Sequence, residues 1–125
     1  MVDDSGNVWL IDPRGTFGST KIYGDKRYDW AKFYYSASGN YDSINSKQFK
    51  VSVISDYVNL EIKSNGYEVM SDYIISRSGM SKKEMLLINA TIWLSLTGYV
   101  KEDIDAAMYA FYKGCELWTE AFSQT

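Results

Sequence analysis

Two aspartate-containing segments near the start of the chain have the residue types and the spacing for phosphate chemistry. Asp12 follows the apolar run 8–11 and begins Asp12-Pro13-Arg14-Gly15, and Gly24-Asp25-Lys26-Arg27-Tyr28-Asp29 comes shortly after it. A carboxylate at the end of an apolar strand, close to a glycine, can direct an oxygen ligand at a metal ion that carries phosphate. We therefore consider Asp12 a candidate metal ligand, and Arg14 and Gly15 candidate cofactor contacts.

Each of these residues also has a purely structural interpretation. An aspartate before a proline is common in turns, so Asp12 could simply form a turn at the end of a strand. Arg14 could be solvated in its loop, and Asp25 could cap a helix that begins near Lys26. The combination of the two segments, more than either segment alone, favours the metal-ligand interpretation.

The composition predicts one packed, helix-rich domain that spans residues 1–125. Hydrophobic residues make up 46% of the chain and aromatic residues 16%, which excludes a disordered protein. The formal net charge is -3, and lysine and arginine are spread along the chain without forming a run. A nucleic-acid partner is therefore not expected.

The residue types that are missing limit the catalytic chemistry. Histidine is absent and Cys115 is the single cysteine, which removes Ser-His-Asp catalysis, Cys-His catalysis and most zinc sites. Any chemistry must therefore rest on carboxylates. No signal peptide is recognisable, and the longest apolar run, 85–96, is too short to cross a bilayer. We expect a cytoplasmic protein without a membrane partner.

Hydrophobic periodicity predicts a small β element and four helices. Strand structure is expected at 8–11 and in a hairpin at 49–63, and residues 15–24 are expected to form a loop. The helices are expected at 26–37, about 66–76, 81–97 and 101–122. The fold class is therefore mainly α with a small β element (α+β).

The ends and faces of these helices can also be predicted. Ser81 and Glu84 form the pattern of a capping box, and Gly98 is expected to end the same helix. This helix is apolar around most of its circumference, so it should be the central buried one. The last helix is expected to pack on it through one apolar face, which consists of Ile104, Ala107, Met108, Phe111, Cys115, Trp118 and Phe122.

Several other residues have a structural and a functional interpretation. The aromatic set Trp30, Phe33, Tyr34, Tyr35 and Tyr41 could stack on a substrate ring, but at helical spacing such residues more often form a core. Cys115 is expected to be an inert buried thiol. Asn89 needs a hydrogen-bonding partner if it is buried, which makes it a candidate for a bond between helices.

The two aspartate segments together resemble the metal-binding segment and the following helix of kinase-like small-molecule phosphotransferases. This group contains the aminoglycoside phosphotransferases and the choline kinases, and the similarity is strongest to capsule-biosynthesis-associated bacterial members with the sequence IDPRG. The matching residues are Trp9 to Gly15 and the motif G-D-x-x-Y-D-x-A-K at 24–32. Ile92 to Leu96 resembles the helical end of that subgroup, less specifically.

The resemblance implies a role for each matching residue. Asp12 corresponds to the aspartate that holds the Mg²⁺ ion bridging the ATP phosphates, and Gly15 to the glycine that lets the loop turn away. Asp25 and Asp29 correspond to the acidic residues of the second motif, where they give structural support and the second one braces the catalytic loop. The implied fold is the helical C-terminal subdomain of a kinase-like protein, and the implied substrate is a small hydroxylated molecule.

The sequence departs from the family in one important respect. The catalytic loop H-x-D-x-x-x-x-N precedes the strand that here begins at Val8, and residues 1–125 contain neither this loop nor the N-terminal lobe. Phosphoryl transfer needs these parts to act together. We therefore expect the C-terminal portion of such an enzyme, with no catalytic residue and no activity by itself. The alternative is a small helical module that self-associates, in which exposed apolar surface forms a homodimer.

Overall fold

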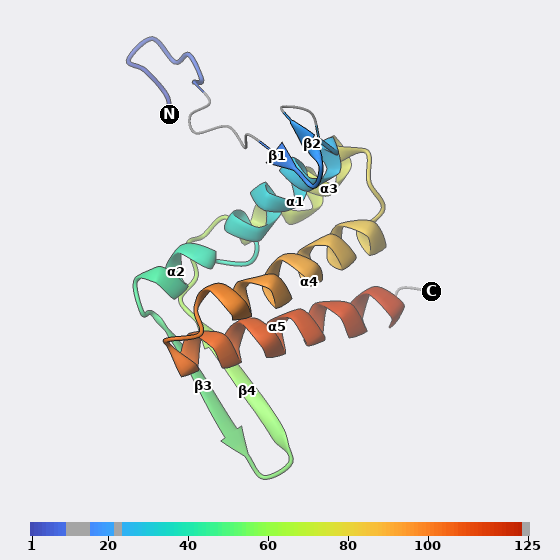
Figure 1. Ribbon diagram of the computed structural model, residues 1–125. Coiled ribbons are helices and arrows are strands. Elements are labelled where there is room, and N and C mark those ends of the chain that lie inside the picture. The colour runs from blue at the N-terminus through green and yellow to red at the C-terminus, as the bar shows by residue number, and fades with distance from the viewer. Residues whose placement is uncertain (10–15, 22–23, 124–125) are drawn as a thin grey trace.

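The computed structural model describes residues 1–9, 16–21 and 24–123. Its elements are β1 (Thr16–Phe17), β2 (Thr20–Lys21), α1 (Lys26–Ala37), α2 (Tyr41–Asn45), β3 (Phe49–Ile54), β4 (Tyr57–Ile62), the 3₁₀ helix η1 (Glu68–Met70), α3 (Ser71–Ser78), α4 (Lys82–Tyr99) and α5 (Ile104–Ser123). Helix α4 lies between α1 and α5, and the β3–β4 hairpin projects beyond α5 (Figure 1). The described part of the chain is therefore mainly helical with small antiparallel sheets, as predicted.

Helix α4 is the central helix, and its start is the predicted capping box. The Ser81 hydroxyl accepts a hydrogen bond from the Glu84 amide at 3.2 Å, and the Glu84 carboxylate accepts one from the Ser81 amide at 2.9 Å. The predicted end at Gly98 is wrong. The helix continues to Tyr99 because the hydrogen-bond pattern goes on, with the Val100 amide donating to the Leu96 carbonyl at 3.0 Å.

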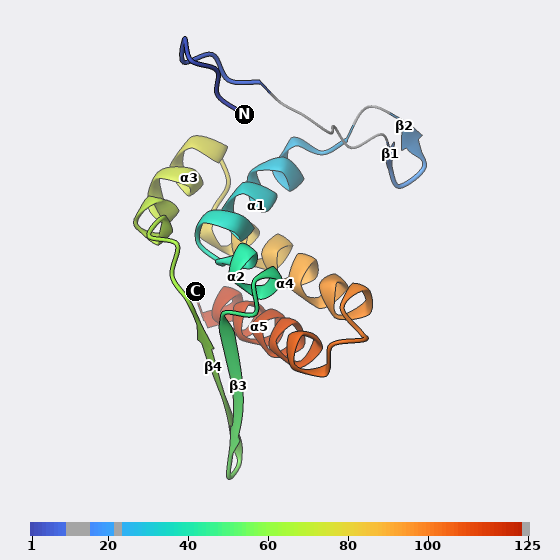
Figure 2. The same ribbon diagram turned by 90° about the vertical axis from the view of Figure 1, so that its left-hand side faces the viewer.

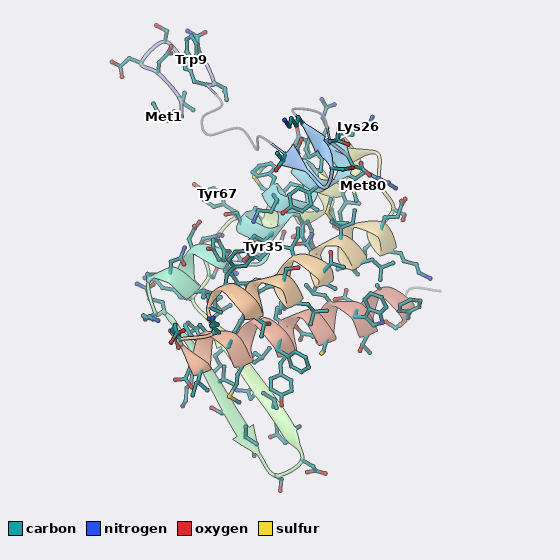
Figure 3. The ribbon with its side chains drawn as sticks, viewed as in Figure 1. Met1, Trp9, Lys26, Tyr35, Tyr67 and Met80 are labelled. Carbon is teal, nitrogen blue, oxygen red and sulfur yellow. The ribbon has the colours of Figure 1, made fainter. Side chains whose placement is uncertain are left out.

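Three aromatic rings from three different helices meet in the core. Tyr35 of α1 lies 4.7 Å from Trp93 of α4, and Trp93 lies 5.6 Å from Tyr109 of α5, measured between ring centroids. All three side chains are buried, and burial raises the pKa of Tyr109 to about 12 and also raises the pKa of Tyr35. Tyr35 lies between α1 and α4 in Figure 3. These rings hold the helical layers together.

The predicted packing face of α5 is wrong. The residues that α5 buries are Ala106, Tyr109, Ala110, Gly114, Leu117 and Ala121. Most of them are small, which lets α5 approach α4 so closely that a Cβ atom on Gly114 would lie 2.6 Å from Leu94. The larger residues Ile104, Phe111, Trp118 and Phe122, predicted to be core, are exposed. Close contact between two helices favours the stripe of small residues over the stripe of large ones.

The β3–β4 hairpin has the predicted position, with slightly longer strands. Phe49 pairs with Ile62 and Ile54 pairs with Tyr57, around a turn at Ser55 and Asp56. At its base the hairpin packs on α5, where the rings of Phe49 and Tyr109 lie 5.6 Å apart. Its tip extends away from the helices (Figure 2).

The structure contains two short elements that were not predicted, α2 and η1. Asn40, which has a left-handed backbone conformation, positions both of them. Asn40 has φ 56°, so the chain turns after α1 and begins α2. The Asn40 amide group donates to Glu68 at 2.9 Å and its oxygen accepts from the Asn65 backbone at 2.8 Å. These two bonds fix the start of η1, which precedes α3. The helix predicted at 66–76 is therefore a 3₁₀ turn followed by a helix that ends at Gly79.

The N-terminal segments differ from the predicted strand and loop. Val8 forms a single β-bridge with Val2, and residues 1–9 are exposed. Trp9 is not part of a strand, and residues 10 and 11 of the predicted strand lie outside the described residues. The predicted loop 15–24 contains the two-residue strands β1 and β2. Within the described ranges, no helix has both the length and the apolar composition needed to cross a membrane.

Candidate functional site

The predicted metal and phosphate ligands precede β1, β2 and the first helix, α1, in the sequence. Asp12, Arg14 and Gly15 fall outside the described residues, so their assignment stays a prediction. The described part of the candidate site begins at Gly24 and includes Asp25, Asp29 and the start of α1. The described residues therefore show how the second motif, residues 24–32, is attached to the helices.

Asp25 caps the N-terminus of α1, as its structural interpretation predicted. Its Oδ1 atom accepts a hydrogen bond from the Arg27 amide at 2.9 Å, and the Arg27 Nε atom donates to Oδ1 and Oδ2 at 3.0 and 2.8 Å. The bonds from the Arg27 side chain, and then the bond from its amide, lower the pKa of Asp25. The carboxylate in turn raises the pKa of Arg27. Asp25 is thus ionised and already occupied by donors, which suits a supporting residue.

Arg27 also connects the beginnings of α1 and α4. Its Nη1 atom lies 3.8 Å from the Glu84 carboxylate, the same group that completes the capping box of α4. Between the two helix ends is a shallow groove of about 380 Å³. Its lining consists of Asp25, Arg27, Tyr28, Glu84, Leu87, Ile88 and Thr91. The groove therefore has charged groups at its rim and apolar side chains along α4.

The remaining motif positions of α1 alternate between core and solvent. Ala31 is completely buried and Tyr28 packs against the core, whereas Asp29 is exposed in the first turn of the helix. Water therefore solvates the Asp29 carboxylate, and the helix dipole stabilises a negative charge at this position. An exposed carboxylate such as this one needs no protein donors to offset desolvation. Its bracing role toward a catalytic loop stays a prediction.

The aromatic set around α1 is mostly structural. Tyr35 is buried and stacks on Tyr41 with ring centroids 4.6 Å apart, and the Lys32 ammonium lies 4.5 Å from the centre of the Tyr35 ring. Trp30 and Tyr34 pack against the core, and only Phe33 is exposed. The core interpretation of this set therefore holds for all its members except Phe33.

The polar and reactive residues of α4 and α5 form no site of their own. Asn89 is buried and donates to the Met85 carbonyl at 3.1 Å within the same helix, so the predicted bond between helices is replaced by a bond to the preceding turn. Cys115 is half-buried and lines a groove of about 770 Å³ between α5 and the tip of the β3–β4 hairpin. In the described ranges, no group of three or more histidine, cysteine, aspartate or glutamate side chains could hold a metal ion.

A tight polar turn lies at the N-terminus, where Asp3, Asp4, Ser5 and Gly6 form a cluster of turn residues. The Asp3 carboxylate accepts hydrogen bonds from the Ser5 and Asn7 amides, from the Asn7 side chain and from the Trp9 indole, each at 2.9 to 3.0 Å. Met1 and Trp9 lie in this segment, apart from the helices (Figure 3). These bonds, above all the one from Trp9, lower the pKa of Asp3 to about 2. The residue types from Asp3 to Gly6 predict a turn, whereas no sequence pattern indicates the bond from Trp9.

We expect Asp3 to titrate well below ordinary aspartates. Because its pKa is lowered in the folded turn, the turn is stabilised at neutral pH and is lost as the pH falls toward about 2. The chemical shift of the Trp9 indole proton, followed by NMR from pH 6 to pH 1.5, should change with that midpoint. In Asp3→Asn the transition should disappear. A Trp9 midpoint near the ordinary value of about 3.9 would contradict the described turn.

Comparisons with family models, curated proteins and solved structures found no match for this chain. The candidate site therefore rests on the residues themselves: a supporting pair, Asp25 and Arg27, whose positions are described, and a predicted ligand segment, Asp12 to Gly15, that precedes it in the sequence.

Proposed function

We propose that this chain is the metal-binding and helical portion of an ATP- and magnesium-dependent phosphotransferase. The acceptor would be a small hydroxylated molecule such as a sugar, an amino alcohol or an aminoglycoside. The observation that carries the proposal is the combination of Asp12-Pro13-Arg14-Gly15 with the motif at 24–32. The proposal is supported by the structure of the second motif, in which Asp25 caps α1 and Ala31 is buried in the core.

In this proposal each part of the segment has a distinct task. Asp12 supplies one carboxylate oxygen to the Mg²⁺ ion, Gly15 lets the backbone turn away, and Arg14 contacts the phosphates. Asp25 caps α1 and α1 packs against α4, so the second motif is anchored to the helical body. Phosphoryl transfer depends on positioning and on neutralising charge by several groups together. Since the H-x-D-x-x-x-x-N loop is not among residues 1–125, the chain alone should bind metal–nucleotide weakly and transfer no phosphate.

The ligand assignment can be tested with a paramagnetic ion that replaces magnesium. We would add Mn²⁺ and a non-hydrolysable ATP analogue to the ¹⁵N-labelled chain and measure the broadening of each backbone amide signal. The amides of Asp12, Arg14 and Gly15 should broaden most, because Mn²⁺ takes the oxygen ligands that Mg²⁺ prefers. Asp12→Asn should remove this broadening.

Asp56→Asn provides the matched control, since it removes one carboxylate from the exposed turn of the β3–β4 hairpin. It should leave the broadening around Asp12 unchanged. The assignment fails if broadening is centred on the acidic turn at Asp3 and Asp4, or if it persists in Asp12→Asn. Transfer of phosphate to any added acceptor by the chain alone would contradict the expected lack of activity.

A further inference from the structure

Helix α5 exposes a continuous row of large apolar side chains. Ile104 is 72% exposed, Phe111 46%, Trp118 46% and Phe122 51%, and the half-buried residues Met108 and Cys115 lie between them. The rings of Trp118 and Phe122 lie 5.5 Å apart. We call these six residues the α5 seam. Exposed aromatic side chains in a continuous row are typical of interaction surfaces.

The spacing of the seam is that of a helix that pairs with another helix. Its six residues follow one another at alternating steps of four and three positions along the whole of α5. This is the a and d repeat of a coiled coil, which keeps one row of side chains facing a partner helix. The seam therefore fits a helix with the same repeat better than it fits a strand or a flat surface.

The chain itself uses the other side of α5. Gly114 packs against Leu94 and Ala90 of α4, Ala110 and Leu117 are buried, and Tyr109 contacts Phe49 of the hairpin. Figure 2 shows α5 at the outer edge of the helical layers, with α4 on one side of it. In the part of the chain that the structure describes, the four exposed residues of the seam face solvent, and Cys115 also lines the groove between α5 and the β3–β4 hairpin.

The charges around the seam favour a second copy as the partner. The positions that flank it are Asp105, Ala107, Tyr112, Gly114, Thr119 and Ala121, and only the first of these is charged. Two seams can therefore meet without rows of like charges opposing each other. Lys113 and Glu116 in the middle of α5 pair with each other at 2.6 Å, and Glu120 near its end pairs with Lys82 of α4 at 3.1 Å, so these charges are compensated within one copy.

At the start of α5, Glu102 and Asp105 outnumber Lys101, and all three are exposed. At its end, the Lys83 ammonium of α4 lies 4.7 Å from the centre of the Phe122 ring. If two copies pair with their α5 helices antiparallel, the acidic start of each helix meets Lys83 of the other copy. The same complementary contact then forms twice, as two-fold symmetry requires.

We propose that two copies of this chain form a homodimer by packing their α5 seams against each other in antiparallel orientation. Phe111 and Cys115 lie near the two-fold axis, and Phe122 of one copy meets Ile104 of the other. The inference is independent of the phosphotransferase proposal, because it uses neither Asp12 nor the α1 motif.

Sedimentation equilibrium over a range of protein concentrations tests the interface. The unmodified chain should show a monomer–dimer equilibrium, and Phe111→Asp should raise its dissociation constant by about 100-fold or more, because it places a charge at the centre of a dry contact. Phe33→Asp is the matched control, since Phe33 is 51% exposed but belongs to α1. It should leave the dissociation constant unchanged, and circular dichroism should show native helix content for both variants.

Charge reversal tests the antiparallel orientation separately. Asp105→Lys and Lys83→Glu should each weaken the dimer, by about 3- to 10-fold, and the double variant should restore it. A short bis-maleimide should link Cys115 of the two copies, and Cys115→Ser should abolish the link. The proposal is overturned if the chain is monomeric at 100 µM, if Phe111→Asp dimerises normally, if the seam instead binds a different protein, or if the double charge reversal fails to restore the dimer.

Discussion

Replacement of Trp93 by alanine should lower the free energy of unfolding by about 3 to 5 kcal/mol, the usual cost of removing a large buried aromatic side chain. Trp93 is completely buried and contacts Tyr35 of α1 and Tyr109 of α5, so its removal leaves a cavity where three helices meet. Its Nε1 atom has no hydrogen-bonding partner among the described residues, so the loss is one of packing alone. Urea unfolding followed by circular dichroism at 222 nm measures the change.

Trp9→Ala is the matched control for this prediction. Trp9 is exposed and its indole donates to Asp3 within the N-terminal turn, so its loss should not affect the unfolding of the helices. Since a domain of this kind is stabilised by only about 5 to 15 kcal/mol, Trp93→Ala should leave a marginal or unfolded protein. A change smaller than that produced by Trp9→Ala would mean that Trp93 is not at the centre of the core.

The elements that could be predicted from the sequence are those fixed by neighbouring residues. Ser81 and Glu84 determine the start of α4 through bonds that span only three residues. Asp25 fixes the start of α1 in the same way. The alternation of apolar and polar residues in 49–63 identifies the hairpin. Such local contacts depend on residue type and spacing alone, so the sequence contains them in full.

The face of α5 could not be predicted, because the helix has two apolar stripes. Hydrophobic periodicity ranks Phe111 and Trp118 above Ala110 and Gly114, and so it selects the wrong stripe. The choice depends on how closely α4 can approach, and this is decided by the small side chains and by Leu94 on the facing helix. The distance between the two helices is a property of the tertiary structure. Because both stripes of α5 are apolar, the sequence pattern alone does not show which of them packs against α4.

In the candidate site, too, local contacts could be predicted and contacts between distant residues could not. The capping role of Asp25 was predictable, whereas the approach of Arg27 to Glu84 joins residues far apart in the sequence and has no local pattern. Asn40 is a similar case, because its bonds to Asn65 and Glu68 exist only once the chain has folded back. The role of Asp12 still rests on its motif, and the Mn²⁺ experiment addresses it directly.

Replacement of Gly39 by alanine should destabilise the protein by about 2 to 3 kcal/mol, at the upper part of the range for overpacked sites. A Cβ atom on Gly39 would lie 2.4 Å from the Tyr35 carbonyl oxygen and 3.2 Å from the Trp93 ring. The first contact is with backbone at the end of α1, and both residues belong to the aromatic core, so neither can move away cheaply. Thermal and urea unfolding of the variant measure the loss.

Gly98→Ala is the matched substitution without a clash. A Cβ atom on Gly98 would meet nothing within 4 Å, and the residue is exposed in the last turn of α4. Alanine has the higher helix propensity, so this variant should be more stable than the parent, by up to about 1 kcal/mol. The two glycine variants should therefore shift the unfolding midpoint in opposite directions. If Gly39→Ala also stabilises the protein, the end of α1 does not pack against Trp93 as closely as described.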